Sequence, residues 1–323
     1  AEAAFAQVMR GESTAVQMSA LLMGLRSRGE AAAEVVGAVR ALRKVMQRLS
    51  APKGKPLVDT CGTGGGKVTT FNISTAAAFV AAGAGARVAK HGNRSFTSRS
   101  GSADVLEALG VVIPADAGGA AVLLERCDMT FMFAPLFHPA MRHVGPIRRE
   151  LGIGTIMNIL GPLANPAGVT RQVIGVADPA RAQLIADALP DLGCEWALVV
   201  HARVGMDEIA PWGETDVWEV KDGKVKQWTL EPRKLGLDAG SPLDLAGGLP
   251  SDNATMIRGI LSGKNQAGGR TAVLLNAAAA LLVAGLAEDF PAAIKRAADA
   301  IDSGAAQGVL EKLVRESKSK VEG

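Results

Sequence analysis

The sequence contains no tyrosine and only three cysteines. Cys61, Cys127 and Cys194 are odd in number and widely separated, so they form neither a metal-binding motif nor a disulfide framework. Such a chain is typical of a reducing compartment, and we expect the protein in the cytoplasm. Cys61 precedes a glycine-rich loop, but no acyl-transfer constellation accompanies it, which favours a small buried side chain over a nucleophile.

The chain also lacks a strong net charge and a membrane-spanning apolar run. Its net charge is +3 and its charged residues are interspersed, which gives no reason to expect a nucleic-acid partner. The most apolar run, Thr271–Ala287, is too short to cross a bilayer and contains Asn276, so it predicts a buried helix. The N-terminus lacks the basic and apolar segments of a signal peptide. We therefore expect neither a membrane nor a nucleic-acid partner.

Glycine is plentiful in one informative stretch, which follows the apolar pair Leu57 and Val58. Residues 59–67 read Asp-Thr-Cys-Gly-Thr-Gly-Gly-Gly-Lys. Glycine tolerates positive φ and has no side chain to block a ligand, so such a run can turn backbone N–H groups toward one anion. The stretch is neither a Walker A loop nor a dinucleotide-binding G-x-G-x-x-G loop.

Two further polar segments follow this loop. Thr70–Thr75 (Thr-Phe-Asn-Ile-Ser-Thr) leads into an alanine-rich helix, whose N-terminus suits phosphate. A short strand pattern at residues 86–89 then ends in Lys90–Ser95 (Lys-His-Gly-Asn-Arg-Ser). Because strand ends converge at one edge of an open α/β sheet, we expect these segments to form a phosphate-binding cradle.

The rest of the chain predicts two parts. Residues 1–52 are helical in pattern, with a capping box at Thr14–Gln17 and a helix end at Gly29. Residues 53–323 alternate helical patterns with apolar runs such as Val111–Ile113 and Met129–Phe133, which predicts a doubly wound sheet with strands buried on both faces. Asp222-Gly223 predicts a tight hairpin. The tail 316–323 is expected to fray.

Two charged pairs are candidates for ligand binding. Arg148 and Arg149 suit a carboxylate, and a solvated pair that uses Glu150 as partner is an equally open interpretation. Asp207 and Glu208 follow a predicted strand, and adjacent carboxylates suit Mg²⁺. Alone, such a pair is more often a solvated loop; a phosphate cradle in the same chain favours the metal.

Three motifs, in this order and spacing, resemble the signature of the anthranilate phosphoribosyltransferases: Gly62–Gly65, Thr70–Thr75 and Lys90–Ser95. The resemblance continues to the end of the chain. It implies a nucleoside phosphorylase/phosphoribosyltransferase-like α/β fold, with a small N-terminal helical domain and a larger doubly wound, mostly parallel domain. It also implies transfer of the phosphoribosyl group from phosphoribosyl pyrophosphate to anthranilate, the second step of tryptophan biosynthesis.

The resemblance implies a homodimer and three sets of site residues. Residues 1–52, joined by helices from about 138–160, would form the dimerisation domain; members of the family carry a further helix before this point, so we expect an N-terminus shortened by one helix. The donor-binding residues would be Gly62, Gly65, Gly66, Thr70, Asn72, Ser74, Thr75, Lys90, His91, Gly92, Asn93, Arg94, Ser95, Ser98 and Ser102. Gly62, Asn93 and Arg148 would bind anthranilate, and Ser74, Asp207 and Glu208 would bind Mg²⁺. No residue is assigned as general acid or base.

Two other interpretations compete. Gly66-Lys67 replaces the Asp-Gly usual in the family, and a lysine after a glycine loop also occurs in pyrimidine nucleoside phosphorylases of similar fold. Lys90–Ser95 and Asp207-Glu208 argue against that activity. A nucleic-acid-binding relative would show a basic stripe and degraded substrate motifs, whereas this chain is nearly neutral and retains Asn93 and Arg148.

Overall fold

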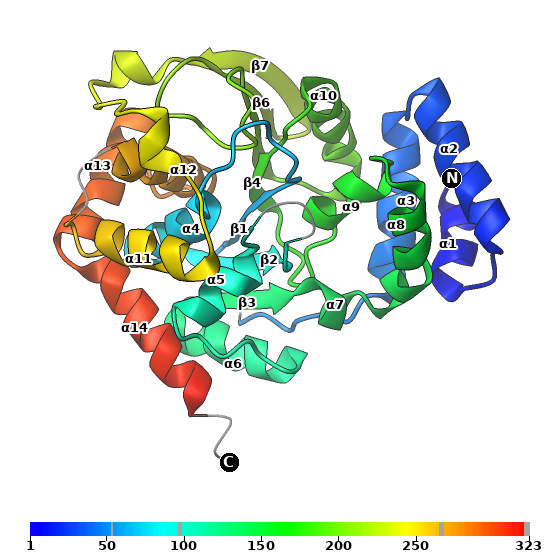
Figure 1. The fold of residues 1–323 in the computed structure, drawn as a ribbon, viewed down its shortest axis with the longest axis horizontal. Coiled ribbons are helices and arrows are strands. Elements are labelled where there is room, and N and C mark those ends of the chain that lie inside the picture. Colours follow the sequence, from blue (N-terminus) through cyan, green and yellow to red (C-terminus); the bar gives the residue numbers. More distant parts are fainter. Residues whose placement is uncertain (53, 96–98, 265–267, 320–323) are drawn as a thin grey trace.

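The computed structural model describes residues 1–52, 54–95, 99–264 and 268–319 (Figure 1). Three helices open the chain: α1 (Glu2–Arg10), α2 (Ala15–Arg28) and α3 (Ala32–Val45). The predicted capping box is confirmed, because the Gln17 N–H donates to Thr14 Oγ1 at 3.2 Å and the Thr14 N–H donates to Gln17 Oε1 at 2.9 Å. Gly29 ends α2 with a φ of 87°, which glycine adopts without strain.

The N-terminal helices share their core with helices from the middle of the chain. The second group comprises α7 (Ala134–Phe137), η1 (Pro139–His143), α8 (Gly145–Leu151) and α9 (Met157–Leu163). α1 contacts η1, α2 contacts α8, and α3 contacts α9, which lies between the N-terminal helices and the sheet (Figure 1). One apolar core joins Phe5, Val39 and Leu160 to Ile174 and Val199 of the sheet.

Seven strands form one sheet in the order β3-β2-β1-β4-β5-β6-β7. They are β1 (Leu57–Gly62), β2 (Arg87–Gly92), β3 (Met129–Phe133), β4 (Arg171–Gly175), β5 (Trp196–Ala202), β6 (Thr215–Lys221) and β7 (Lys224–Leu230). Strands β1 to β5 are parallel, and β6 and β7 are antiparallel to their neighbours. The chain builds outward from β1 to β3 and returns on the other side of β1 with β4. Ligands of open α/β sheets bind beyond the strand ends at such a reversal.

Helices cover both faces of the sheet, as the predicted doubly wound fold requires. α4 (Ile73–Gly83) and α12 (Gly268–Val283) pack on one face, and α10 (Pro179–Ala188) packs on the other. Every residue of α12 is buried, which confirms the predicted buried helix; no helix in the described ranges is long and apolar enough to cross a lipid bilayer. The remaining helices are α5 (Ser102–Ala108), α6 (Ala117–Cys127), η2 (Pro190–Leu192), η3 (Pro232–Leu235), η4 (Pro242–Leu245), α11 (Pro250–Leu261), α13 (Phe290–Asp302) and α14 (Ala305–Lys318).

Two predictions about local structure are wrong, and a hydrogen bond joins the two segments concerned. Val111–Ile113 is not a strand but part of the connection between α5 and α6, because Pro114 follows it and no strand of the described sheet pairs with it. The chain from Glu316 onward continues as helix α14 to Lys318 instead of fraying there. The Val112 N–H donates to Ser317 Oγ at 3.0 Å, which joins the α5–α6 connection to the last turn of α14.

The antiparallel edge of the sheet holds all four tryptophans of the chain. Trp196 lies on β5, Trp218 on β6 and Trp228 on β7, and Trp212 lies in the segment that leads into β6. The hairpin between β6 and β7 turns through Asp222 and Gly223 with φ values of 51° and 73°. Two consecutive positive φ values are typical of a type I′ turn, so the predicted hairpin is confirmed.

Candidate active site

The glycine loop begins where β1 ends, beside the end of β4. Gly62 pairs with Gly175 in the sheet register, and Gly64 and Gly65 have φ values of 69° and 83°. The Gly64 N–H donates to Asp207 Oδ2 at 2.8 Å. A Cβ on Gly62 would lie 2.6 Å from the same oxygen. The loop therefore holds the Asp207 carboxylate with its backbone, and a side chain at Gly62 would displace that carboxylate. Gly64 and Gly65 are needed instead for their positive φ.

Asp207 and Glu208 lie on the connection between β5 and β6, as the sequence places them. Thr70 Oγ1 donates to Glu208 Oε2 at 3.2 Å, and the Ser74 N–H also bonds to this carboxylate. Burial raises the pKa of both carboxyl groups, and the nearby charge of Asp207 raises the pKa of Glu208 further. Because the two buried carboxylates repel each other, the pair favours a cation bound between them.

Lys90 brings a positive charge next to Thr60 and Ser74. It is 1% exposed, and its Nζ donates to the Thr60 carbonyl and lies 3.3 Å from Ser74 Oγ. Burial lowers the pKa of Lys90, while the charge of Asp59 opposes that effect. Asp59 is a fully buried residue of β1 and accepts hydrogen bonds from the His91 N–H at 3.2 Å and from Asn165 Nδ2 at 2.8 Å.

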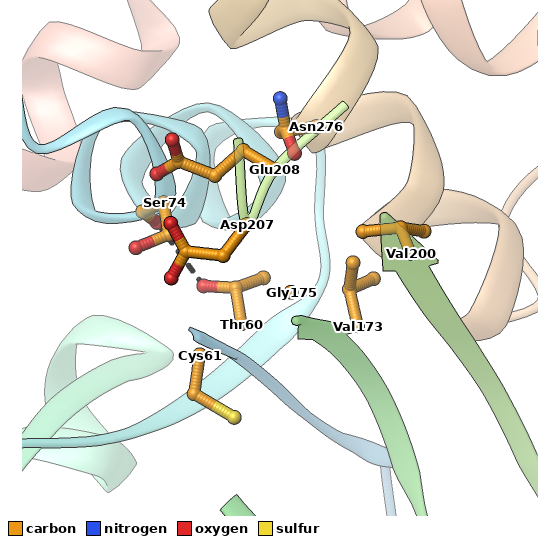
Figure 2. A pocket seen from close by; sticks show the side chains of 9 residues that line it. All are labelled: Thr60, Cys61, Ser74, Val173, Gly175, Val200, Asp207, Glu208 and Asn276. Carbon is orange, nitrogen blue, oxygen red and sulfur yellow. Dashed lines mark hydrogen bonds between the residues drawn. The ribbon is translucent and has the colours of Figure 1, made fainter. Parts of the chain in front are cut away.

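Figure 2 shows the pocket between Ser74 and the two carboxylates, and the oxygens of Ser74, Asp207 and Glu208 lie on the same side of it. The pocket is a small cavity of about 10 Å³. It is lined by Thr60, Cys61, Ser74, Val173, Gly175, Val200, Asp207, Glu208 and Asn276. Burial raises the pKa of the Cys61 thiol, which keeps it protonated and agrees with a side chain that is not a nucleophile.

The oxygen ligands at this site suit Mg²⁺ better than a metal ion that the protein would surround completely. Within the described part of the chain, no cluster of three or more His, Cys, Asp or Glu side chains is arranged to hold an ion. Mg²⁺ takes one or two protein carboxylates and completes its shell with water and phosphate oxygens. Asp207, Glu208 and the Ser74 hydroxyl supply such a partial shell, and a cation there would offset the raised carboxyl pKa values.

The N-terminus of α4 is fastened by polar contacts from distant segments. Asn72 Oδ1 accepts from Ser100 Oγ at 3.1 Å and from Asn253 Nδ2 at 3.0 Å. Asn253 lies on α11, and no pattern in the sequence pointed to it. Thr75 is fully buried in the first turn of α4, and its Oγ1 has no hydrogen-bond partner among the described residues. Asn72 and Thr75 thus lie at the N-terminus of α4, where Asn72 is engaged by the protein itself and the Thr75 hydroxyl is closed to solvent.

The segment after β2 is directed partly away from the cradle. Asn93 O accepts from Ser102 Oγ at 3.2 Å, which joins two predicted donor contacts. Arg94 forms ion pairs with Asp104 at 2.8 Å and Glu107 at 2.7 Å, so its guanidinium faces α5. The Ser95 N–H donates to Asp104. Ser98, also predicted to bind the donor, lies outside the described residues.

Arg148 lies on α8, on the side of the molecule where α8 contacts α2. It is partly buried, and in the described ranges no hydrogen bond or ion pair satisfies its guanidinium. Burial alone lowers its pKa. Its neighbour Arg149 is exposed. A guanidinium taken from water without a partner favours a planar anion such as a carboxylate.

Two histidines connect the cradle to the helical group. His91 Nδ1 lies 3.2 Å from the Gly161 carbonyl, and the rings of His91 and His138 meet edge to face with centroids 5.0 Å apart. Burial lowers the pKa of His91 to about 3 and that of His138 to about 4. Both rings are therefore neutral near pH 7, and the sequence did not predict this pairing.

Comparisons with known proteins agree with this geometry. A family model described as "Glycosyl transferase family, a/b domain" matches residues 54–307, and one described as "Glycosyl transferase family, helical bundle domain" matches residues 1–46. The anthranilate phosphoribosyltransferases of Herpetosiphon aurantiacus and Rubrobacter xylanophilus are each 48% identical over 318 residues, which is 98% of this chain and 94% or 92% of theirs.

Solved structures give the same result. The anthranilate phosphoribosyltransferase of Thermus thermophilus matches with a TM-score of 0.92 and 40% identity, covering 97% of this chain and 93% of that one. The Saccharomyces cerevisiae enzyme in complex with PRPP and Mg matches with a TM-score of 0.87 and 29% identity, covering 98% and 91%. This chain belongs to the anthranilate phosphoribosyltransferase family.

Proposed function

We propose that this chain transfers the phosphoribosyl group of phosphoribosyl pyrophosphate to the amino group of anthranilate. The products are N-(5-phosphoribosyl)anthranilate and pyrophosphate. The observation that carries the proposal is the meeting of Asp207, Glu208 and Lys90 with the glycine loop at the sheet reversal. An anion-binding loop, a buried cation and a carboxylate pair suit a pyrophosphate leaving group better than any neutral ligand.

The donor's phosphates would lie over the glycine loop and the N-terminus of α4. Backbone N–H groups of Gly62, Gly65 and Gly66 and the hydroxyls of Ser74 and Thr75 are the contacts we assign to it. Ser74, Asp207 and Glu208 would hold Mg²⁺, which supplies charge neutralisation for pyrophosphate departure. Lys90 would stabilise the negative charge that develops on the departing pyrophosphate, because its side chain is already held in place and shielded from water.

Arg148 and Asn93 would orient anthranilate, with the Arg148 guanidinium on its carboxylate. That assignment is supported by the partial burial of Arg148 and by its lack of a partner among the described residues. The bond from the anomeric carbon to pyrophosphate breaks with oxocarbenium character, as in other transfers at that carbon. The arylamine is already nucleophilic, so alignment of the two substrates supplies the acceleration without a dedicated base.

We further propose a homodimer formed through residues 1–52 together with the helices of residues 138–160. The support is that the two groups of helices share one apolar core and so form a single helical unit. The three free thiols support a cytoplasmic setting.

The proposed function is tested by following anthranilate fluorescence with and without the donor and Mg²⁺. Consumption of anthranilate only when both are present, with release of pyrophosphate, is the expected result. Phosphorolysis of thymidine in place of this reaction would refute the proposal. A variant carrying both Asp207→Ala and Glu208→Ala should lose turnover and its response to Mg²⁺; wild-type activity and metal dependence in that variant would show that the metal assignment is wrong.

A further inference from the structure

Asn276 is a buried amide in a helix that is otherwise almost entirely apolar along this stretch. It lies in the middle of α12 and is 5% exposed. Its Oδ1 accepts from the Ile209 N–H at 3.1 Å, and its Nδ2 donates to the Ile209 carbonyl at 2.9 Å and to the Ala272 carbonyl at 2.9 Å. The side chain thus pairs with both backbone groups of one residue, as a neighbouring strand would.

The residue that Asn276 grips directly follows the carboxylate pair. Figure 2 shows Asn276 beside Glu208 at the wall of the pocket. The other end of the same connection is also fixed, because the Lys67 N–H donates to the Gly205 carbonyl at 2.8 Å and the Ala202 N–H donates to the Met206 carbonyl at 3.1 Å. The backbone that carries Asp207 and Glu208 is therefore held by hydrogen bonds on both sides of the pair, and Asn276 makes those on the Ile209 side.

Burying the Asn276 amide costs free energy, so a contribution to stability does not by itself explain its presence in α12. Transfer of an unpaired amide from water into an apolar interior is unfavourable, and only hydrogen bonds offset that cost. Ala272 belongs to the same helix and its carbonyl needs no side-chain partner. The contact to Ile209 is the one that reaches another element, so the useful consequence of the amide is the placement of that backbone.

We propose that Asn276 is a positioning residue for the metal-binding carboxylates of Asp207 and Glu208. By clasping Ile209 it fixes the spacing of the two carboxylates before any ion binds. The inference rests on the proposed function, in that it takes this pair as the site for a divalent cation. Residues that orient metal ligands without touching the metal are commonly worth 10- to 100-fold in affinity, roughly the effect we expect here.

The test compares Asn276→Leu with a matched control in the same helix. Thr271→Val removes the buried hydrogen bond from Thr271 Oγ1 to the Asp238 carbonyl at 2.6 Å, without touching residues 207–209. Mn²⁺ binding in the presence of inorganic pyrophosphate is measured by electron paramagnetic resonance, next to the KM for anthranilate. Asn276→Leu should weaken Mn²⁺ binding at least about 10-fold and leave the anthranilate KM within about twofold, while Thr271→Val leaves both unchanged.

Equal Mn²⁺ affinity in Asn276→Leu and wild type, or equal weakening in both variants, would overturn the inference. If Asn276→Leu does not fold, hydrogen exchange of the wild-type protein decides: the Ile209 amide should exchange as slowly as the α12 amides, and fast exchange contradicts the clasp. Wild-type protein that binds Mn²⁺ but transfers no phosphoribosyl group would refute the proposed function alone. The variant comparison would still decide the role of Asn276.

Discussion

Gly175→Ala should disable the site without adding or removing any charged group. The backbone of Asp207 passes directly over Gly175 at the end of β4, and an added Cβ would overlap the Asp207 carbonyl oxygen. The carbonyl carbon would lie 2.6 Å from that Cβ, whereas ordinary contact requires at least 3.4 Å. The carbonyl oxygen overlaps more than the carbon, so the segment must retreat by more than about 1 Å, and a displacement of about 1 Å in an active site already costs roughly 100-fold in rate.

The assay is steady-state transfer activity at saturating donor and Mg²⁺, with the fold checked by circular dichroism. Gly308→Ala is the control, because Gly308 is exposed within α14 and nothing described lies within 4 Å of where its added methyl group would stand. That control should gain about 0.5–1 kcal/mol of stability and keep its activity. A folded Gly175→Ala protein with turnover within about threefold of wild type would refute the argument that Asp207 must stay where it is.

Three further predictions follow from the charged groups around the site. Arg148→Ala should raise the KM for anthranilate at least about tenfold, with the donor KM unchanged; an equal effect of Arg149→Ala in the same kinetic assay would contradict the assignment. Lys90→Met should lower kcat by about 100-fold or more, because it removes a preorganised charge from the site; unchanged kcat would exclude that role. In the folded protein the pKa values of His91 and His138 are lowered to about 3 and about 4. As the pH falls below 6.5, these histidines therefore become protonated in the unfolded chain but stay neutral in the folded one. These two histidines should therefore contribute a drop of about 2–4 kcal/mol in the free energy of unfolding between pH 7.5 and pH 5, which the raised carboxyl pKa values of Asp207 and Glu208 oppose. In urea denaturation, stability should fall less over this range in His138→Gln than in wild type, and an equal fall would contradict the assignment.

The features predictable from the sequence are those fixed by short-range chemistry. The capping box at Thr14, the Asp222-Gly223 turn and the glycine loop each follow from the conformational preferences of a few adjacent residues. The pattern of alternating helices and strands likewise predicts the sheet, because its strands read as apolar runs. The position of the glycine loop is predictable for the same reason, because it begins where β1 ends at Gly62.

The features that sequence patterns missed depend on partners far along the chain. Asn253 reaches Asn72 across 181 residues, and nothing near either residue predicts the pairing. Arg94 pairs with Glu107 on α5, a choice of side-chain direction that its motif does not determine. Val111–Ile113 shows the same limit for backbone, since whether a short apolar run becomes a strand depends on a vacant neighbour in the sheet.

The concentration of tryptophan at one edge of the sheet gives the molecule a built-in optical probe. With no tyrosine in the chain, its ultraviolet emission arises from four indoles between residues 196 and 228, and Trp212 lies four positions after Glu208. A spectral change when Mg²⁺ and pyrophosphate are added would therefore originate at this edge of the sheet, because the N-terminal helices contain no tryptophan. Binding of Mg²⁺ and pyrophosphate can then be followed by tryptophan fluorescence, without labels or coupled enzymes.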